Sequence, residues 1–393
     1  MTTEIDTSNH KALHEVIDIT IGNCYLQTQG VDVAIPYIVG APGGGKTASI
    51  KGTATTHGFG MVSTHFALKP LEETGGIPQF ENLEINGEKM LGTIWSFPDI
   101  MKHLYQTAEK MPNDRNGNKQ MVIWLLDDMH LMSAIHNAMM YELLTERKLR
   151  DYALPENVAI VLAGNHASNK AGAKTMFSAI INRVALLPIF TSFDAWKTDF
   201  AIPNKIHPAI VSFLENDQYN QFFHEEEQVA TPWGSPRAWS RLSNWIRAQE
   251  QWYNKTMKDD MMLYIAGGHV SKEAASQFQQ YYGIFTKFDI EAILEAGDKY
   301  RLPDDPVDRY ALAYALTSHF AGRKDRNTIV FPFSQILHKY IQDHQDLGLM
   351  VIHEIINIEK ILNKRNLFIS ISNELNKIEP GITEKLLKEV TSV

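Results

Sequence analysis

The segment best suited to chemistry is a glycine-rich stretch at residues 40–47. It reads Gly-Ala-Pro-Gly-Gly-Gly-Lys-Thr and matches the pattern G-x-x-x-x-G-K-T. Glycines let successive backbone N–H groups wrap a phosphate at close range, and a following helix adds a favourable dipole. Lys46 is expected to neutralise phosphate oxygens, and the Thr47 hydroxyl to ligate Mg²⁺. The predicted nucleotide-binding residues are Gly40, Pro42, Gly43, Gly44, Gly45, Lys46, Thr47 and Ala48.

A phosphate loop of this kind needs a second metal-binding acid at the end of a neighbouring buried strand. Residues 122–128 read Val-Ile-Trp-Leu-Leu-Asp-Asp, an apolar run that ends in two carboxylates. Asp127 is expected to hold Mg²⁺ through water, and Asp128 to orient the attacking water. The alternative for this pair is a solvated turn at the end of the strand.

These residues must be positioned by strands and helices, and the first half of the chain alternates short apolar runs with helical patterns. That alternation predicts βαβ units around a parallel sheet. Between the third and fourth runs, Met132, Ile135, Met139 and Leu143 recur at helical spacing, so that stretch is predicted as a helix. The predicted strands are residues 35–39, 61–66, 122–126, 158–163 and 184–189.

After about residue 190 the strand pattern fades and helical patterns replace it. Ser235 and Pro236 predict the start of a helix, since serine caps helices and proline suits their first position. We therefore expect a P-loop α/β core with a five-stranded parallel sheet at residues 1–192, a helical lid domain at 193–320 and a helical C-terminal extension at 321–393.

The composition indicates a folded, acidic protein: 393 residues, 44% of them hydrophobic and 21% charged, with a net charge of −9. The acidic balance argues against nucleic acid as a partner. The single cysteine, Cys24, is typical of a protein in a reducing compartment. No apolar run is long enough to span a membrane, and the first residues lack the basic segment of a secretory signal. We expect a cytoplasmic protein without a membrane partner.

With these residues in place, the sequence resembles the AAA+ ATPases, and more narrowly the small MoxR-like ATPases of bacteria and phages. The resemblance begins ahead of the phosphate loop and covers about 320 residues. Besides the two motifs above, the segments that resemble the family are Gly-Gly-Ile-Pro at 75–78, Trp-Ser-Phe-Pro at 95–98, Leu-Pro-Glu-Asn-Val at 154–158, Ala-Gly-Asn at 163–165, Asn-Arg at 182–183 and Gly-Ser-Pro-Arg at 234–237.

The resemblance implies roles for three further residues in catalysis. Asn165 matches sensor 1, which helps position the hydrolytic water, and it also lies at a strand end where open α/β sheets bind ligands. Arg183 matches the arginine finger that enters a neighbouring subunit's site, and Arg237 matches sensor 2 of the lid. In the alternative interpretation, Asn165 caps the turn after its strand, Arg183 is a surface arginine and Arg237 is an arginine at a helix start. Arg241 could compete with Arg237 for the sensor 2 role.

The resemblance also implies a homo-oligomeric ring, most often a hexamer, that uses ATP, ADP and Mg²⁺ to remodel a client protein, with a von Willebrand factor A domain protein as a possible partner. It implies an inserted hairpin at residues 69–98, where Trp95 either contacts the client or packs the hairpin base. The family usually has glutamate at the position of Asp128. The sequence therefore leaves the rate of ATP hydrolysis open.

Two other functions stay open. One is a nucleic-acid-linked motor or helicase loader, and the other is a scaffold that binds ATP and hydrolyses it slowly or not at all. Trp233, Trp239, Trp245 and Trp252 follow one another at six- or seven-residue intervals, which favours a packed core over a base-stacking surface.

Overall fold

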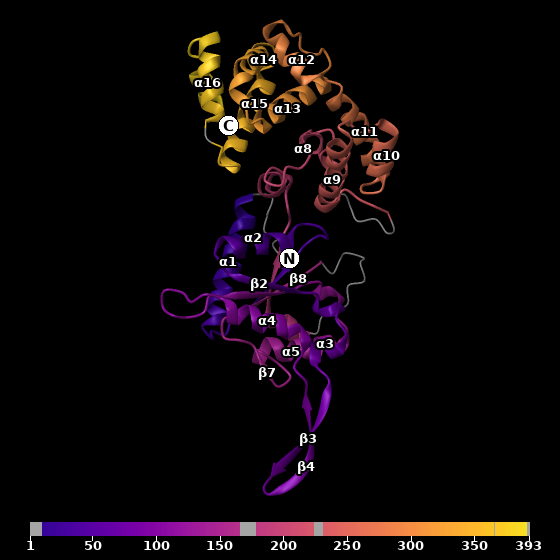
Figure 1. The fold of residues 1–393 in the computed structure, drawn as a ribbon, viewed down its shortest axis with the longest axis vertical. Coiled ribbons are helices and arrows are strands. Elements are labelled where there is room, and N and C mark those ends of the chain that lie inside the picture. The colour runs from indigo at the N-terminus through magenta and orange to yellow at the C-terminus, as the bar shows by residue number, and fades with distance from the viewer. Residues whose placement is uncertain (1–9, 166–177, 224–230, 365, 391–393) are drawn as a thin grey trace. The chain divides into compact units, whose positions relative to one another are not determined.

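The structure is a computed structural model that describes residues 10–165, 178–223, 231–364 and 366–390 (Figure 1). The chain divides into two compact units, Met1–Ser192 and Phe193–Val393. The first unit combines a sheet with helices, and the described part of the second unit is helical. The expected division of the second unit at residues 320 and 321 remains a prediction.

The first unit is built on a five-stranded sheet in the order β2-β5-β8-β1-β9, and all neighbouring strands in it are parallel. Every residue of β1, β5 and β8 is buried, as expected for strands covered on both faces. The predicted fold class, an α/β core with a five-stranded parallel sheet followed by helices, is confirmed. The strands are β1 (Ile35–Val39), β2 (Gly60–Thr64), β5 (Val122–Leu126), β8 (Val158–Gly164) and β9 (Val184–Pro188).

Helices cover both faces of this sheet: Figure 1 shows α1 and α2 on one side and α3, α4 and α5 on the other. Alternate strand residues, such as Trp124 and Ile160, join the core under α4 and α5, while their neighbours point to the opposite face. The helical segments are α1 (His10–Thr28), α2 (Lys46–Thr56), η1 (Phe66–Leu68), α3 (Leu71–Gly75), α4 (Asp99–Lys110), η2 (Met129–Leu131), α5 (Ala134–Glu146) and α6 (Ser178–Ile181).

The strand predicted at residues 61–66 is displaced, because β2 begins at Gly60 and ends at Thr64. Phe66 instead opens the short helical turn η1 and is fully buried in the core, so its apolar character reflects burial after the strand rather than pairing within it. The other four strands agree with their predicted ranges to within one residue.

A hairpin of β3 (Pro78–Ile85) and β4 (Glu88–Trp95) extends from the first unit within the predicted insertion (Figure 1). Asn86 and Gly87 form its two-residue turn, and both have positive φ, which is the arrangement that matches strand twist. Trp95 lies at the hairpin base, where the Arg150 guanidinium stacks 4.2 Å above its ring. Arg150 belongs to the turn of a short second hairpin, β6 (Lys148–Leu149) and β7 (Tyr152–Ala153).

The second unit consists of helices around two apolar clusters, and α13 contributes to both. In the described part of the chain, no helix combines the length and the apolar character that a membrane crossing requires. The helical segments are α7 (Phe193–Trp196), the π-helical turn η3 (Lys197–Ala201), α8 (Pro208–Glu215), η4 (Asn220–Phe222), α9 (Pro236–Tyr253), α10 (Asp259–Gly267), α11 (Lys272–Thr286), α12 (Ile290–Ala296), η5 (Gly297–Lys299), α13 (Pro306–Gly322), η6 (Arg326–Thr328), α14 (Val330–Asp343), α15 (Gln345–Ile361), α16 (Leu367–Ile378) and α17 (Ile382–Val390).

The predicted start of α9 is confirmed, since Pro236 is its first residue and Ser235 accepts a hydrogen bond from the backbone N–H of Ala238. The expectation of a buried tryptophan series is wrong for two members. Trp239 is fully buried, but Trp245 is 54% exposed and Trp252 is 84% exposed. The two lie a third of a turn away from the buried side of the helix, so periodic spacing alone did not distinguish them from core residues.

A buried ionic cluster ties four segments of the second unit together. The Lys197 ammonium, 8% exposed, donates to Glu215 at 2.7 Å, to Glu354 at 2.6 Å and to the Tyr314 hydroxyl at 2.9 Å. Burial raises the pKa of Glu215, and the Lys197 charge opposes that shift. Because two carboxylates face one ammonium, the lysine is the group whose loss leaves the most uncompensated charge.

Replacing Lys197 by methionine is therefore expected to lower the free energy of unfolding by about 3–5 kcal/mol, because it leaves the buried Glu354 carboxylate and the partly buried Glu215 carboxylate unpaired. The matched control is Lys287→Met, because Lys287 pairs with Asp308 at 2.5 Å but is 44% exposed, and such pairs contribute about 0–1 kcal/mol. Chemical denaturation of both variants is the measurement. Equal losses in the two variants would show that the buried cluster does not stabilise the unit.

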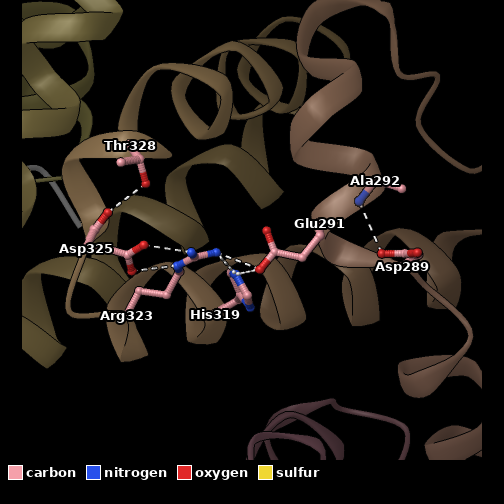
Figure 2. Close-up of polar contacts among 7 residues, drawn as sticks. All are labelled: Asp289, Glu291, Ala292, His319, Arg323, Asp325 and Thr328. Atoms are coloured by element: carbon pink, nitrogen blue, oxygen red, sulfur yellow. Dashed lines mark hydrogen bonds and ion pairs between the residues drawn. The ribbon is translucent and has the colours of Figure 1, made fainter.

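A second, exposed ion cluster joins α12 to the end of α13 (Figure 2). Arg323 donates to Glu291 at 2.6 Å and forms a two-pronged contact with Asp325 at 2.8 and 2.9 Å. The hydrogen bonds from Arg323 lower the pKa of Asp325 to about 2. The depressed pKa means that this contact supports the fold above the normal aspartate pKa and is lost as the pH falls toward 2.

Candidate nucleotide-binding site

The glycine-rich loop connects β1 to α2, as predicted, at the carboxyl edge of the parallel sheet. Gly45 precedes the helix with φ of +83°, a left-handed conformation that favours glycine. A Cβ on Gly40 would lie 2.7 Å from the Ile189 carbonyl oxygen, so the loop needs glycine there for close packing against the end of β9. Thr191 holds the loop from that side, since its hydroxyl donates to the Gly44 carbonyl at 2.5 Å.

Lys46 lies buried at the first turn of α2 and connects the loop to the end of β8. Its ammonium donates to the carbonyl oxygens of Gly40 at 3.0 Å and Ala41 at 2.9 Å, and to the Asn165 side-chain oxygen at 3.1 Å. The structure thus brings together the two predicted site residues Lys46 and Asn165, which are 119 positions apart in sequence. A positive charge at this place suits an anion bound by the loop.

Thr47 and Asp127 also meet, as the metal-binding hypothesis requires. The Thr47 hydroxyl donates to the Asp127 carboxylate at 2.6 Å, and Asp127 is only 7% exposed. A hydroxyl and a carboxylate are hard oxygen ligands, and Mg²⁺ typically takes few protein ligands and completes its shell with phosphates and water. The pair therefore fits a Mg²⁺ ion that is bound together with a nucleotide.

Asp128 follows directly, in a left-handed backbone conformation with φ of +58°. Its backbone N–H donates to the Asp127 carboxylate at 2.9 Å, and its own carboxylate lies 2.9 Å from Nδ1 of His65. His65 comes directly after β2, the strand next to β5. The carboxylate of Asp128 is thus held in a defined position at the same edge of the sheet as Asp127.

Asn165, the residue after β8, is held by a histidine that sequence reasoning did not single out. Its backbone N–H donates to Nδ1 of His130 at 3.2 Å, and its side-chain amide nitrogen lies 3.2 Å from Nε2 of the same ring. Burial, followed by the positive charge of Lys46, lowers the pKa of His130, while nearby carboxylates oppose the shift. His130 is therefore expected to be neutral and to orient Asn165 rather than to carry charge.

Arg183 lies just before β9 and packs against α5 of its own chain. Its guanidinium stacks 4.3 Å above the Tyr141 ring and donates to the Tyr141 and Thr145 hydroxyls, each at 2.9 Å, and to the Ala179 carbonyl at 2.8 Å. These contacts use three of the five N–H donors that a guanidinium carries. The side chain is thus positioned with donor capacity left over.

Arg237 lies in the second unit, in the first turn of α9, where it is exposed. Arg241, one turn later on the same helix, is exposed as well. The sensor 2 role of Arg237 remains a prediction.

Three residues that help to build the site were missed in the sequence: His65, His130 and Thr191. Each belongs to a segment distant in sequence from the residue it contacts, and none lies in a recognisable motif. The position of His65 directly after a strand at the carboxyl edge was the one available signal.

No protein-family model and no curated protein matches the chain. Among solved structures, it is similar to the Holliday junction branch migration motor RuvB of Thermotoga maritima, with 12% identity, a TM-score of 0.31 and coverage of 72% of this chain and 74% of that one. It is also similar to a proposed ATPase from Cytophaga hutchinsonii, with 11% identity, a TM-score of 0.29 and coverage of 92% and 79%. Both similarities are weak.

Proposed function

We propose that the protein is a Mg²⁺-dependent AAA+ ATPase of the MoxR-like kind. The observation that supports this most is the meeting of four predicted residues at one sheet edge: Thr47 with Asp127 at 2.6 Å, and Lys46 with Asn165 at 3.1 Å. These pairs join a phosphate loop to the carboxyl ends of two further strands. This is where α/β sheets bind ligands, and where a nucleotide and its metal would be held.

Each residue has a role in this proposal. Thr47 and Asp127 would hold Mg²⁺, which when bound neutralises charge on the phosphates. Lys46 neutralises phosphate oxygens alongside it. Asp128 orients and deprotonates the attacking water, and Asn165, oriented by His130, keeps that water in line.

The complete site is proposed to form between subunits of a homo-oligomeric ring, most often a hexamer in related proteins. Arg183 of one subunit would then reach the γ-phosphate held by the next, where a guanidinium can stabilise developing charge. Arg237 would report the state of the nucleotide, ATP or ADP, to the helical lid. The ring is proposed to use this cycle to remodel a client protein, together with a von Willebrand factor A domain partner.

Replacing Lys46 by alanine is expected to lower kcat by roughly 10²- to 10³-fold, the usual effect of removing a donor aimed at transition-state charge. ATP binding should weaken as well. The matched control is Lys51→Ala, an exposed lysine on the same helix. Phosphate release and binding of a fluorescent ATP analogue, each with and without Mg²⁺, are the measurements. Hydrolysis that persists in Lys46→Ala would mean that this loop is not the catalytic site.

A further inference from the structure

The second unit carries an exposed stripe of residues along α9, and the proposed ATPase site does not use its two tryptophans. The stripe, defined as Arg241, Trp245, Ala248 and Trp252, follows the spacing i, i+4, i+7 and i+11, which places all four on one side of a helix. All four are exposed, and Trp252 is 84% exposed. Two exposed tryptophans on one side of a helix form an apolar patch, and such patches mark binding surfaces more often than single exposed residues do.

Of the two tryptophans, Trp245 has a packing partner and Trp252 is 84% exposed. They are two helical turns apart, or about 10.5 Å along the axis at 1.5 Å per residue. Trp245 packs edge-on against His269, which follows α10, with ring centroids 6.1 Å apart. Figure 1 shows α9 beside α10 and α11 within the second unit. The spacing is about three times the 3.4 Å rise between stacked bases, so each ring can stack on a separate base.

The segment that carries the α9 stripe is basic although the whole chain is acidic, and the next acids, Asp259 and Asp260, begin α10. Between residues 237 and 258 the only acid is Glu250, although the protein carries a net charge of −9. Glu250 is engaged elsewhere, since it contacts Nε2 of His207 at 3.1 Å and the Tyr282 hydroxyl at 3.4 Å. The exposed basic residues that remain available in this segment are Arg241, Lys255 and Lys258. Arg247 donates to the Asn204 and Lys205 carbonyls, and Arg237 is assigned to the nucleotide.

Exposed aromatic rings interleaved with basic side chains suit single-stranded nucleic acid, because its bases offer flat faces for stacking and its phosphates carry negative charge. An apolar protein partner would leave unpaired the basic side chains that flank the tryptophans, among them Arg241 at one end of the stripe and Lys255 beyond the other. A nucleic acid duplex hides its base faces, so the tryptophans would have nothing to stack on.

We propose that the α9 stripe binds single-stranded nucleic acid, with Trp245 and Trp252 stacking on bases and the surrounding basic residues contacting phosphates. The site lies entirely within the second unit. It does not depend on ATP hydrolysis or on the phosphate loop.

The test uses the full chain and two fluorescein-labelled probes of about 16 nucleotides, an oligothymidine DNA and an oligouridine RNA, followed by anisotropy at several salt concentrations. Trp245→Ala and Trp252→Ala are each expected to weaken binding by roughly 5- to 150-fold, while Trp252→Phe keeps a stacking ring and most of the affinity. Arg241→Gln should reduce the slope of log affinity against log salt by about 0.7. The matched control is Phe331→Ala, a 46% exposed aromatic on α14 outside the stripe.

Several results would overturn the proposal. One is no binding of either probe by the wild type at low salt, and another is Trp252→Ala behaving like Phe331→Ala. Equal binding of a duplex with no loss in the tryptophan variants would indicate electrostatic attraction without stacking. If polyglutamate binds with the same tryptophan dependence, the surface serves an acidic protein. If the variants change the sedimentation of the protein and no probe binds, the stripe is a contact between copies of the chain.

Discussion

Replacing Arg183 by alanine is expected to lower the hydrolysis rate per subunit by roughly 10³- to 10⁵-fold, the range found for arginines that stabilise a transferring phosphoryl group. ATP binding should change little, because the guanidinium packs on α5 of its own chain and not on the phosphate loop. Tyr141→Phe should cause a smaller loss, since it keeps the ring under the guanidinium and removes one acceptor. Steady-state phosphate release is the measurement.

The control is Arg115→Ala, an exposed arginine in the loop before β5. A mixing experiment separates action within a subunit from action between subunits. The Arg183→Ala and Lys46→Ala proteins are each expected to be nearly inactive alone. Mixed rings should recover part of the rate, since an intact loop in one subunit can meet an intact arginine from the next. A rate unaffected by Arg183→Ala would exclude the finger role.

Replacing Asp128 by asparagine is expected to lower kcat by roughly 10²- to 10⁴-fold, the usual contribution of a positioned general base. The affinity for ATP should be preserved, because Lys46, Thr47 and Asp127 remain. Asp151→Asn, at an exposed aspartate, is the control. The measurement is single-turnover hydrolysis beside equilibrium nucleotide binding.

The longer side chain gives the complementary test of Asp128. The Asp128 carboxylate already has a defined place 2.9 Å from Nδ1 of His65. Asp128→Glu should therefore reduce the rate of hydrolysis, because the longer side chain displaces the carboxylate from that place. A large rise in the rate with glutamate would instead indicate that aspartate has sacrificed turnover. In that case the protein acts as an ATP-bound scaffold.

The fold of the first unit could be predicted closely because its signals are local. β1 and β5 are continuous apolar runs that end in motif residues, and both coincide with their predicted ranges. β2 differed because Phe66 is apolar for a different reason, its burial in the helical turn after the strand. Hydropathy reports burial, and it does not say whether a buried residue pairs in a sheet.

The candidate site was predicted where residue types lie in a contiguous motif, and missed where tertiary structure supplies the partner. Lys46, Thr47 and Asp127 belong to such motifs, whereas His130 reaches Asn165 across 35 positions. Trp239 and Trp252 also show that a sequence pattern does not reveal tertiary contacts. Both fall on a helical pattern, yet one is fully buried and the other exposed, since burial depends on which neighbouring helices pack against each side.

The central claim is that ATP is hydrolysed at a site completed between subunits. Its most direct test is the steady-state rate of ATP hydrolysis per subunit across about a hundredfold range of protein concentration, with Lys46→Ala as the blank and sedimentation run in parallel. If the site is completed between subunits, the rate per subunit climbs with protein concentration as rings assemble. A rate that stays at the Lys46→Ala level while the protein assembles, or a substantial rate in a solution of monomers, would contradict it.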